Sequence, residues 1–265
     1  MIILKLGGSI LTKKSSTIPQ IDSENLERIA KEIKKSLDNH NKKLIIVHGA
    51  GSFGHPPAKK YNIGKIFKNE EYPLKRIGFS TTQNAVKKLN TEICKVFIDN
   101  KLPVVTIQPS TFITTSNGRI NYGNLDLIKK YLDEDYIPVL YGDVVLDDKL
   151  KMAVLSGDQI IQYLAMNLES DRIILGTDVD GVYNKNPKTN DDAILFERFN
   201  SMDELDSLDS TTNVDVTGGM IGKIKELLEL ADIGIDSKII NVNKKDFVYK
   251  ALENEDIKGT VISKK

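Results

Sequence analysis

The chain has 265 residues, of which 40% are hydrophobic and 28% are charged, so it is long enough to bury a substantial core in one large or two small domains. Its 37 Lys and Arg residues balance its 37 Asp and Glu residues, which argues against nucleic acid or anionic lipid as a general partner. The single cysteine, Cys94, excludes an internal disulfide and fits a reducing compartment. The sequence contains no apolar stretch of membrane-spanning length and no signal-peptide pattern. We therefore expect a cytoplasmic protein.

Apolar runs alternate with segments of helical period along most of the chain. Strands that are mainly apolar are expected at residues 2–6, 44–47, 104–107, 139–141, 173–175 and 238–241. Helices are expected to begin near Asp22 or Ser23 and near Ser80 or Thr81, and to span residues 219–231. Such alternation predicts parallel strands with helical crossovers, and the apolar strands indicate a sheet covered on both faces. The predicted fold class is therefore α/β, a three-layer αβα sandwich with a mainly parallel central sheet.

Two polar segments interrupt this pattern. Residues 59–76 are weakly periodic and predict a loop or short helix able to cover a site, and residues 184–192 predict a second loop. We also expect two lobes that share one sheet, residues 1–168 and 169–265, divided between the groups of glycine motifs described next.

Three glycine-bearing segments are the most informative feature of the chain: KLGGS at residues 5–9, HGAGSFGH at 48–55 and DVTGGM at 215–220. The first two directly follow apolar strands. A strand that ends in glycines leaves backbone N–H groups free to point at an anion, and a following helix adds its positive N-terminal end. Lysines accompany these loops. The pattern predicts transfer of a phosphoryl group between two phosphate-bearing ligands.

Absent motifs narrow the kind of enzyme. The chain has no GxxxxGK[ST] and no GxGxxG after a strand, which argues against a P-loop NTPase and a dinucleotide-binding domain. The HRD and DFG signatures of protein kinases are missing as well. No His, Cys and Asp constellation predicts a metal site built from side chains.

Lysine and histidine side chains near the loops are candidates for chemistry. Lys5 lies on an otherwise apolar strand, where a cation costs free energy unless it meets an anion, so we place it at the transferring phosphoryl group. Lys14 lies in a polar turn, where a surface position and a role in transfer both remain open. His55 precedes two prolines, in a place with little helix or strand character, and the neighbouring glycines favour a role at a phosphate. His48 ends a buried strand and is predicted to be a core residue.

Carboxylates follow two further strand-like segments. Asp158, in SGD, either holds an active lysine or lies near magnesium, or it caps a helix. Asp178 and Asp180 are expected to fix a turn through Asx hydrogen bonds, with Gly181 supplying a positive φ, so that backbone surrounds a nucleotide. Lys223 lies one turn into a helix that opens on glycines, where either a phosphate site or a simple helix start is possible.

Taken together, KLGGS, VHGAGSFGH, YGDVV, SGD, TDVDGVY and DVTGGMIGK resemble the amino acid kinase superfamily in order and spacing over nearly the whole chain. The histidine of GAGSFGH resembles the one that the archaeal isopentenyl phosphate kinases of this superfamily use on their phosphate acceptor. The resemblance implies the superfamily sandwich and a homodimer. It further implies that ATP and isopentenyl phosphate give isopentenyl diphosphate and ADP, with magnesium, in an alternative mevalonate route. The acceptor is then expected in the N-terminal lobe and ATP in the C-terminal lobe.

The resemblance also assigns residues to roles. It implies ATP contacts for Lys5, Gly7, Gly8, Ser9, Gly51, Asp178, Asp180, Gly181, Tyr183, Gly218 and Lys223. It implies acceptor contacts for Gly49, Ala50, His55 and Gly157, and a catalytic set of Lys14, His55, Lys5, Lys223 and Asp158. Ala50 stands where many members have glycine, and Gln159 follows Asp158 where some have a second aspartate. The isoprenoid tail is expected near Ile77, Phe79 and the helix that follows.

Two alternatives stay open. A kinase of the same fold could act on another acceptor, such as a phosphonate, a nucleoside monophosphate or an amino acid carboxylate. A non-catalytic nucleotide-binding protein could also keep the fold, although Lys5, Lys14 and Lys223 argue against it. A phosphate acceptor is already anionic at neutral pH, so the expected mechanism is direct in-line transfer without a strong general base.

Overall fold

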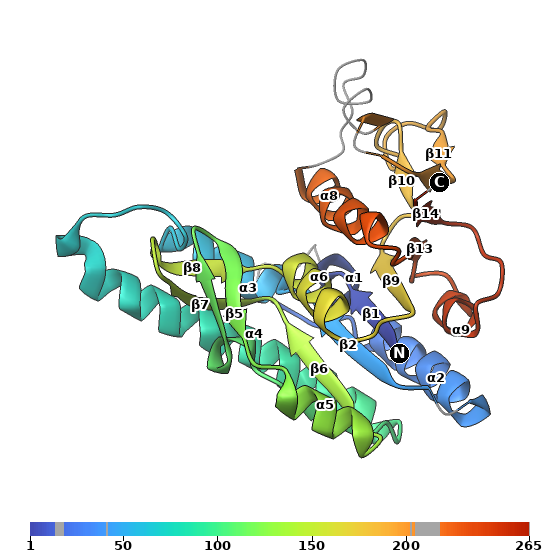
Figure 1. Ribbon diagram of the computed structural model, residues 1–265, viewed down its shortest axis with the longest axis horizontal. Coiled ribbons are helices and arrows are strands. Elements are labelled where there is room, and N and C mark those ends of the chain that lie inside the picture. Colours follow the sequence, from blue (N-terminus) through green and yellow to red (C-terminus); the bar gives the residue numbers. More distant parts are fainter. Residues whose placement is uncertain (14–18, 41, 202, 205–217, 265) are drawn as a thin grey trace.

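A computed structural model describes residues 1–13, 19–40, 42–201, 203–204 and 218–264. Figure 1 shows a central sheet with helices on both sides and a long helix that extends to one end of the molecule. In this described part of the chain, no helix combines the length and apolar character needed to cross a bilayer.

The central sheet has eight strands and is parallel except for one pair. Its order is β12-β14-β13-β9-β1-β2-β6-β3, and only β13 and β14 run antiparallel. The bounds are β1 (Ile2–Leu6), β2 (Leu44–His48), β3 (Val104–Thr106), β6 (Ile137–Tyr141), β9 (Arg172–Thr177), β12 (Arg198–Phe199), β13 (Ser237–Asn241) and β14 (Thr260–Ile262). The predicted fold class is confirmed.

The helices cover both faces of this sheet. They are α1 (Gly8–Leu11), α2 (Ser23–Asn39), α3 (Gly51–Lys60), α4 (Tyr72–Asp99), α5 (Asp126–Asp133), α6 (Gly157–Asn167), α8 (Gly218–Asp232) and α9 (Phe247–Glu253), with short 3₁₀ turns η1 (Asn69–Glu71) and η2 (Pro109–Thr111). Local capping fixes two of the starts. The Asp22 carboxylate accepts from the Asn25 N–H at α2, and the Ser156 hydroxyl accepts from the Gln159 N–H at α6.

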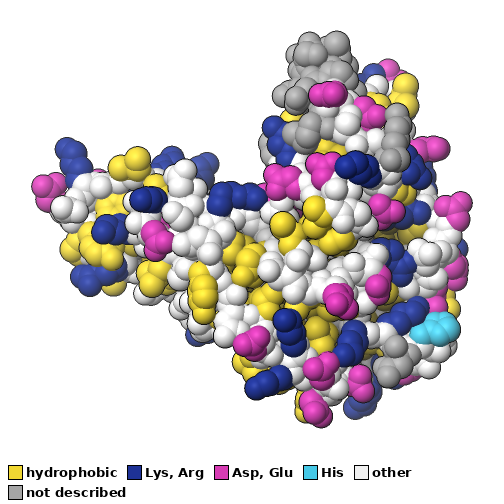
Figure 2. All heavy atoms as spheres, in the orientation of Figure 1, with side chains coloured by type: hydrophobic (Ala, Val, Ile, Leu, Met, Phe, Trp, Pro, Cys, Tyr) yellow, Lys and Arg dark blue, Asp and Glu magenta, His cyan; other side chains and the backbone are white. Residues whose placement is uncertain are grey.

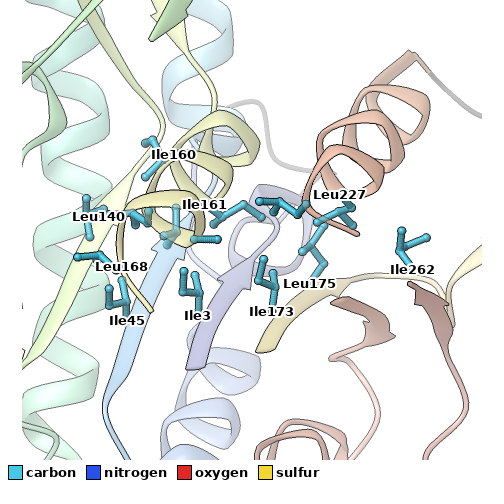
Figure 3. Close-up of a cluster of buried hydrophobic side chains, with 14 of the residues drawn as sticks. Ile3, Ile45, Leu140, Ile160, Ile161, Leu168, Ile173, Leu175, Leu227 and Ile262 are labelled. Carbon is cyan, nitrogen blue, oxygen red and sulfur yellow. The ribbon is translucent and has the colours of Figure 1, made fainter. Parts of the chain in front are cut away.

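Alternating residues of each central strand enter different cores. Ile3 belongs to the cluster under α5, α6 and α8, whereas Leu4 belongs to the cluster under α2, α4 and α9. Figure 3 shows the first cluster, where Ile3, Ile45 and Ile173 of three neighbouring strands lie beneath Ile161 of α6. Because side chains alternate along a strand, Lys5 shares the face of Ile3 and is directed toward α6 and α8.

A second sheet, which the sequence did not predict, lies beside the central one. It has the order β5-β4-β7-β8, formed by β4 (Ile113–Ser116), β5 (Arg119–Gly123), β7 (Asp143–Asp147) and β8 (Lys151–Leu155). The Asp147 carboxylate stabilises two turns of this sheet. It accepts hydrogen bonds from the Thr115 hydroxyl and from the N–H groups of Asn117, Gly118, Lys149 and Leu150. A short ribbon of β10 (Val182–Tyr183) and β11 (Leu195–Phe196) completes the strands.

Most expected elements are present, with one clear error. The six predicted strands and the starts of α2 and α8 agree with the structure to within two residues. The helix expected from Ser80 or Thr81 instead begins at Tyr72 and carries Pro73 in its first turn. Residues 59–76 therefore contain the end of α3, a turn, η1 and the start of α4. The segment after residue 168 enters the same sheet, since β9 pairs with β1, and the division into two lobes stays a prediction.

Candidate active site

A cavity of about 760 Å³ opens beyond the carboxyl ends of β1, β2 and β9. The first residues of α1, α3 and α6 line it, and N–H groups at such positions have no intrahelical acceptor. Figure 2 shows the molecule hollowed between the parts that carry β8 and α8, both of which contribute to the lining. A second cavity, of about 720 Å³, lies at the opposite edge around Ile2, Arg172 and Ser237, and none of the described glycine loops reaches it. The first cavity is therefore the candidate site.

The first two glycine loops pack backbone against backbone at the floor of this cavity. A Cβ atom on Gly8 would lie 2.5 Å from both the N and the Cα of Gly51, and one on Gly49 would lie 2.7 Å from the N of Gly8. Gly51 also has a φ of +51°, which L side chains rarely adopt. Glycine at these positions is therefore what allows the amides after β1 and β2 to converge on one small volume.

Three charged side chains meet in the same cavity. Lys5 is only 4% exposed, and its ammonium group donates to the Asp158 carboxylate. The Lys223 ammonium of α8 lies 3.6 Å from the other oxygen of Asp158. Burial lowers the pKa of Lys5, the Asp158 charge opposes this, and the nearby Lys223 charge adds to the lowering. One carboxylate thus holds two cations side by side, an arrangement suited to a phosphate that carries more than one negative charge.

His55 lines the cavity from α3. Desolvation by the cavity wall lowers its pKa, and the Lys223 charge lowers it further. Both residues line the same cavity, although they are far apart in sequence. A neutral imidazole at this position retains one N–H that can donate to an anionic ligand.

One part of the cavity wall is apolar. It is formed by side chains of α3, α4, β7 and β8, namely Ala58, Val86, Val144, Val154 and Leu155. The tail pocket was expected near Ile77 and Phe79, but neither lines the cavity and Ile77 is 59% exposed. Thr82 and Val86, farther along the same helix, do line it. One space therefore joins a charged, amide-rich end to a hydrocarbon-compatible wall.

Comparison with known proteins places the chain in a family. The sequence model of the Amino acid kinase family matches residues 1–241. The chain belongs to the amino acid kinase family. It is 52% identical to the isopentenyl phosphate kinase of Methanothermobacter thermautotrophicus over 100% of both chains. Its fold superposes on a solved isopentenyl phosphate kinase with a TM-score of 0.88, at 47% identity and 99% coverage of both chains. It also superposes on the product complex of the T. acidophilum isopentenyl phosphate kinase with a TM-score of 0.78, at 26% identity and 99% coverage of both chains.

Most residues that the sequence proposed for an amino acid kinase site line this first cavity. They are Lys5, Gly7, Gly8, Ser9, Gly49, Ala50, Gly51, His55, Gly157, Asp158, Asp178 and Lys223. Lys14 lies outside the described residues, as do residues 215–217 of the third glycine segment, and Gly218 is the first residue of α8. Among the described residues, Thr82, Asp143, Ser156 and Glu226 also line the cavity and were not predicted. Asp143 belongs to the YGDVV motif, one of the segments that resemble the superfamily.

Three residues expected at the nucleotide do not line this cavity. These residues are Asp180, Gly181 and Tyr183. The Asp180 carboxylate accepts a hydrogen bond from Asn241 and forms ion pairs with Lys244 and Lys258. Desolvation opposes the effect, but hydrogen bonds and charges from these partners lower the pKa of Asp180 to about 2. The expected positive φ of Gly181 is wrong. Glycine is required there because a Cβ would lie 2.3 Å from the hydroxyl of Thr260.

The expectation that His55 lies outside regular structure is also wrong. Helix α3 runs from Gly51 to Lys60 and includes Pro56 and Pro57. Within this helix Gly54 allows a close approach to α4, because a Cβ there would lie 2.6 Å from a methyl group of Val86. His48, by contrast, is fully buried, as predicted.

Proposed function

We propose that this protein transfers the γ-phosphoryl group of ATP to isopentenyl phosphate, forming isopentenyl diphosphate and ADP. The observation that carries this proposal is the single cavity in which the Lys5–Asp158–Lys223 cluster, the glycine loops, His55 and an apolar wall occur together. The full-length similarity to proteins named isopentenyl phosphate kinase supports the same substrate.

The proposed reaction is a direct in-line transfer. A terminal oxygen of isopentenyl phosphate attacks the γ-phosphorus of ATP, a new P–O bond forms, and the bond from that phosphorus to the β,γ-bridging oxygen breaks. The electron pair of the broken bond stays on ADP. Because the attacking oxygen is already anionic, the protein has to supply positioning and positive charge rather than a strong base.

Cations and amides serve the transferring group in this scheme. Lys5, held by Asp158, and Lys223 balance the charge that builds up on the γ-phosphoryl oxygens. Backbone N–H groups of Gly8, Ser9 and Gly51 bind the ATP phosphates, and Gly7, whose own N–H donates to the Gly176 carbonyl oxygen, shapes the loop beside them. We further propose Lys14 as a third catalytic cation, whose replacement by alanine is expected to lower turnover while ATP still binds.

The acceptor phosphate takes the other side of the cavity. His55 donates a hydrogen bond to it, and the loop from Gly49 through Ala50 together with Gly157 supplies backbone contacts. The hydrocarbon tail packs against Val86 and Val154. On the nucleotide side, we propose that Asp178, Asp180, Gly181, Tyr183 and Gly218 surround the ribose and base, with part of ATP reaching beyond the described cavity.

Magnesium fits this arrangement through ATP. Mg²⁺ takes oxygen ligands and commonly binds through one or two carboxylates plus substrate phosphates. Asp158 and Asp178 line the charged end of the cavity, but their carboxylates pair with Lys5, Lys223 and Lys188, so the ion would be held mainly by the ATP phosphates. When bound, the ion would neutralise phosphate charge, whereas orientation of the two substrates depends on the residues named above.

Several broader features belong to the same proposal. We propose a cytoplasmic homodimer that works in an alternative mevalonate route, with the acceptor lobe at residues 1–168 and the nucleotide lobe at 169–265. Figure 2 shows acidic and basic side chains interspersed over the face in view, which supports a small-molecule rather than a nucleic acid partner. Light scattering of the purified protein tests the dimer.

The test of function is a panel of acceptors in a coupled assay of ADP release with Mg²⁺ and ATP. The panel contains isopentenyl phosphate, dimethylallyl phosphate, a phosphonate, a nucleoside monophosphate and glutamate. The proposal predicts the highest kcat/KM with isopentenyl phosphate. A higher value with glutamate, the phosphonate or the nucleotide would assign another acceptor, and ATP binding without transfer to any compound would indicate a non-catalytic protein.

A further inference from the structure

His48 is a buried side chain that the proposed reaction does not use. It is the last residue of β2, has 0% of its surface exposed and stacks on Tyr141 with ring centroids 5.3 Å apart. Its Nδ1 lies 3.0 Å from the carbonyl oxygen of Gly49, and its Nε2 lies 3.1 Å from the side-chain oxygen of Asn90. The ring thus sits directly behind the second glycine loop, with an oxygen at each nitrogen.

Only one of the two ring nitrogens can donate a hydrogen bond when the ring is neutral. Burial lowers the pKa of His48 to about 4, so the ring is neutral at pH 7 and carries a single N–H. If that proton were on Nε2, the bare Nδ1 and the Gly49 oxygen would face each other lone pair to lone pair at 3.0 Å. With the proton on Nδ1, a half-turn of the Asn90 amide lets its NH₂ group donate to Nε2. The Asn90 oxygen then accepts from the Thr106 hydroxyl, which lies 3.0 Å from the amide nitrogen. Both ring nitrogens and both ends of the Asn90 amide then have partners, and the Cys94 sulfur, which lies 3.7 Å from the Asn90 side-chain oxygen before the turn, keeps the Thr106 hydroxyl as a neighbour at 3.4 Å.

The position of the Gly49 carbonyl controls the next amide. In a trans peptide the C=O and the N–H point in opposite directions, so a Gly49 oxygen drawn back to His48 turns the Ala50 N–H away from the ring. The Ala50 nitrogen lies 3.6 Å from the point that a Cβ on Gly142 would occupy, and the Gly157 nitrogen lies 3.6 Å from the same point. All three residues line the cavity. Two amide nitrogens, together with the carbonyl oxygen of Leu155 at 3.4 Å, therefore flank a small space that any side chain at position 142 would fill.

We propose that His48 is a positioning residue that locks the Gly49–Ala50 peptide through its Nδ1–H, so that the Ala50 N–H points at the acceptor phosphate. Glycine at position 49 is required by the close approach of the first loop, and glycine leaves the peptide free to rotate. The hydrogen bond from His48 removes this freedom and holds the Ala50 amide in its binding orientation before the acceptor binds. The assignment of the bound anion as the acceptor phosphate rests on the proposed function.

The direct test of the lock is the tautomer of His48 in the wild-type protein. The ¹⁵N chemical shifts of the two ring nitrogens, measured at pH 7 without ligands, distinguish a protonated nitrogen from a bare one. The proposal predicts a proton on Nδ1 and none on Nε2. A proton on Nε2 alone, or a cationic ring, would overturn it. This result does not depend on which acceptor the enzyme uses.

Two matched variants test the consequence for binding. In His48→Asn the side-chain amide can donate from the position of Nδ1, whereas in His48→Gln it reaches only the position of Nε2. We expect His48→Asn to keep the KM for isopentenyl phosphate within about threefold, and His48→Gln to raise it about tenfold, the effect of losing one hydrogen bond to an anion. The KM for ATP should change less than about twofold in both.

The outcomes separate the two proposals. Equal acceptor KM values in the two folded variants, whether normal or raised, would contradict the lock, because a purely structural role would not distinguish the two amides. Thermal unfolding of each variant controls for loss of folded protein. If the wild-type enzyme fails to phosphorylate isopentenyl phosphate, the proposed function is wrong. The ¹⁵N measurement and a titration of the Ala50 and Gly157 amide signals with inorganic phosphate then decide the inference, and the absence of shifts in both amides would overturn it.

Discussion

Gly8→Ala tests whether the contact between the two glycine loops shapes the site. The added Cβ would lie 2.5 Å from the N and Cα of Gly51, whereas ordinary contacts of this kind begin at 3.4 Å. The loops must therefore separate by about 1 Å, since both sides of the contact are backbone. Overpacking of this kind costs about 1–3 kcal/mol of the free energy of unfolding.

The loss of activity should exceed the loss of stability. A displacement of about 1 Å in a group that positions substrate can cost roughly 100-fold in rate. We therefore expect kcat of Gly8→Ala to fall about 100-fold, measured by ADP release at saturating ATP and acceptor. Urea denaturation monitored by circular dichroism gives the free energy of unfolding of the same preparation.

Gly78→Ala is the matched control. Its Cβ would lie 2.4 Å from the Cβ of Tyr61, an equally severe clash, but Gly78 does not line the cavity. This variant should lose about 1–3 kcal/mol of stability and keep the kcat of its folded fraction. The reasoning is refuted if folded Gly8→Ala retains turnover within about threefold of wild type, or if both variants lose turnover to the same extent.

Three further changes probe the cavity and its support. His55→Ala should lower kcat/KM for isopentenyl phosphate about 10- to 100-fold, the loss of one hydrogen bond to a charged group, with an unchanged KM for ATP; normal kinetics would remove His55 from the mechanism. Asp158→Asn should cost about 3 kcal/mol of unfolding free energy and lower kcat at least about tenfold, because it leaves the buried Lys5 without its counter-charge. Urea denaturation measures the first effect and ADP release the second, and an unchanged kcat would refute the role of Asp158 in holding Lys5. The His48 pKa of about 4, against an ordinary 6.5, means that the unfolded chain takes up the proton first as the pH falls. Wild type should therefore lose about 3 kcal/mol relative to His48→Asn between pH 6.5 and pH 4 and nothing above pH 7, and parallel stability curves for the two proteins would contradict this.

The parts of the fold that were predictable are those in which local sequence and tertiary environment agree. Apart from Lys5 and His48, strands β1 and β2 are apolar because helices cover both of their faces, and the glycines that follow them mark the loops directly. Lys5 could be placed in the site because a cation in a buried strand needs a partner. The identity of that partner, Asp158, depends on the packing of α6 over β1, which spacing in the sequence does not give.

The start of α4 was missed because its buried side is not apolar. Lys75 is 6% exposed, and its ammonium group donates to the carbonyl oxygens of Tyr61 and Asn62. Gly78 is buried against Tyr61 three residues later. A lysine and a glycine at core positions hide the helical period, so the hydrophobic pattern becomes visible only farther along the helix.

The second sheet was missed for a related reason. Strands β4 and β5 contain Thr, Ser, Arg and Asn at many positions, and their pairing is fixed by the hydrogen bonds of Asp147 rather than by an alternating apolar face. Gly181 illustrates the same limit at the scale of one residue. The sequence suggested that a turn with positive φ requires this glycine. The structure shows that the requirement comes from close contact with Thr260, which is remote in sequence.

The central claim is that one cavity brings ATP and isopentenyl phosphate together for direct transfer. The most direct measurement is ³¹P NMR of the purified protein with Mg²⁺ and equal amounts of the two compounds, followed until ATP is consumed. The account predicts that isopentenyl diphosphate and ADP appear in equal amounts and that no inorganic phosphate accumulates. ADP accompanied by inorganic phosphate, with isopentenyl phosphate left unchanged, would contradict it.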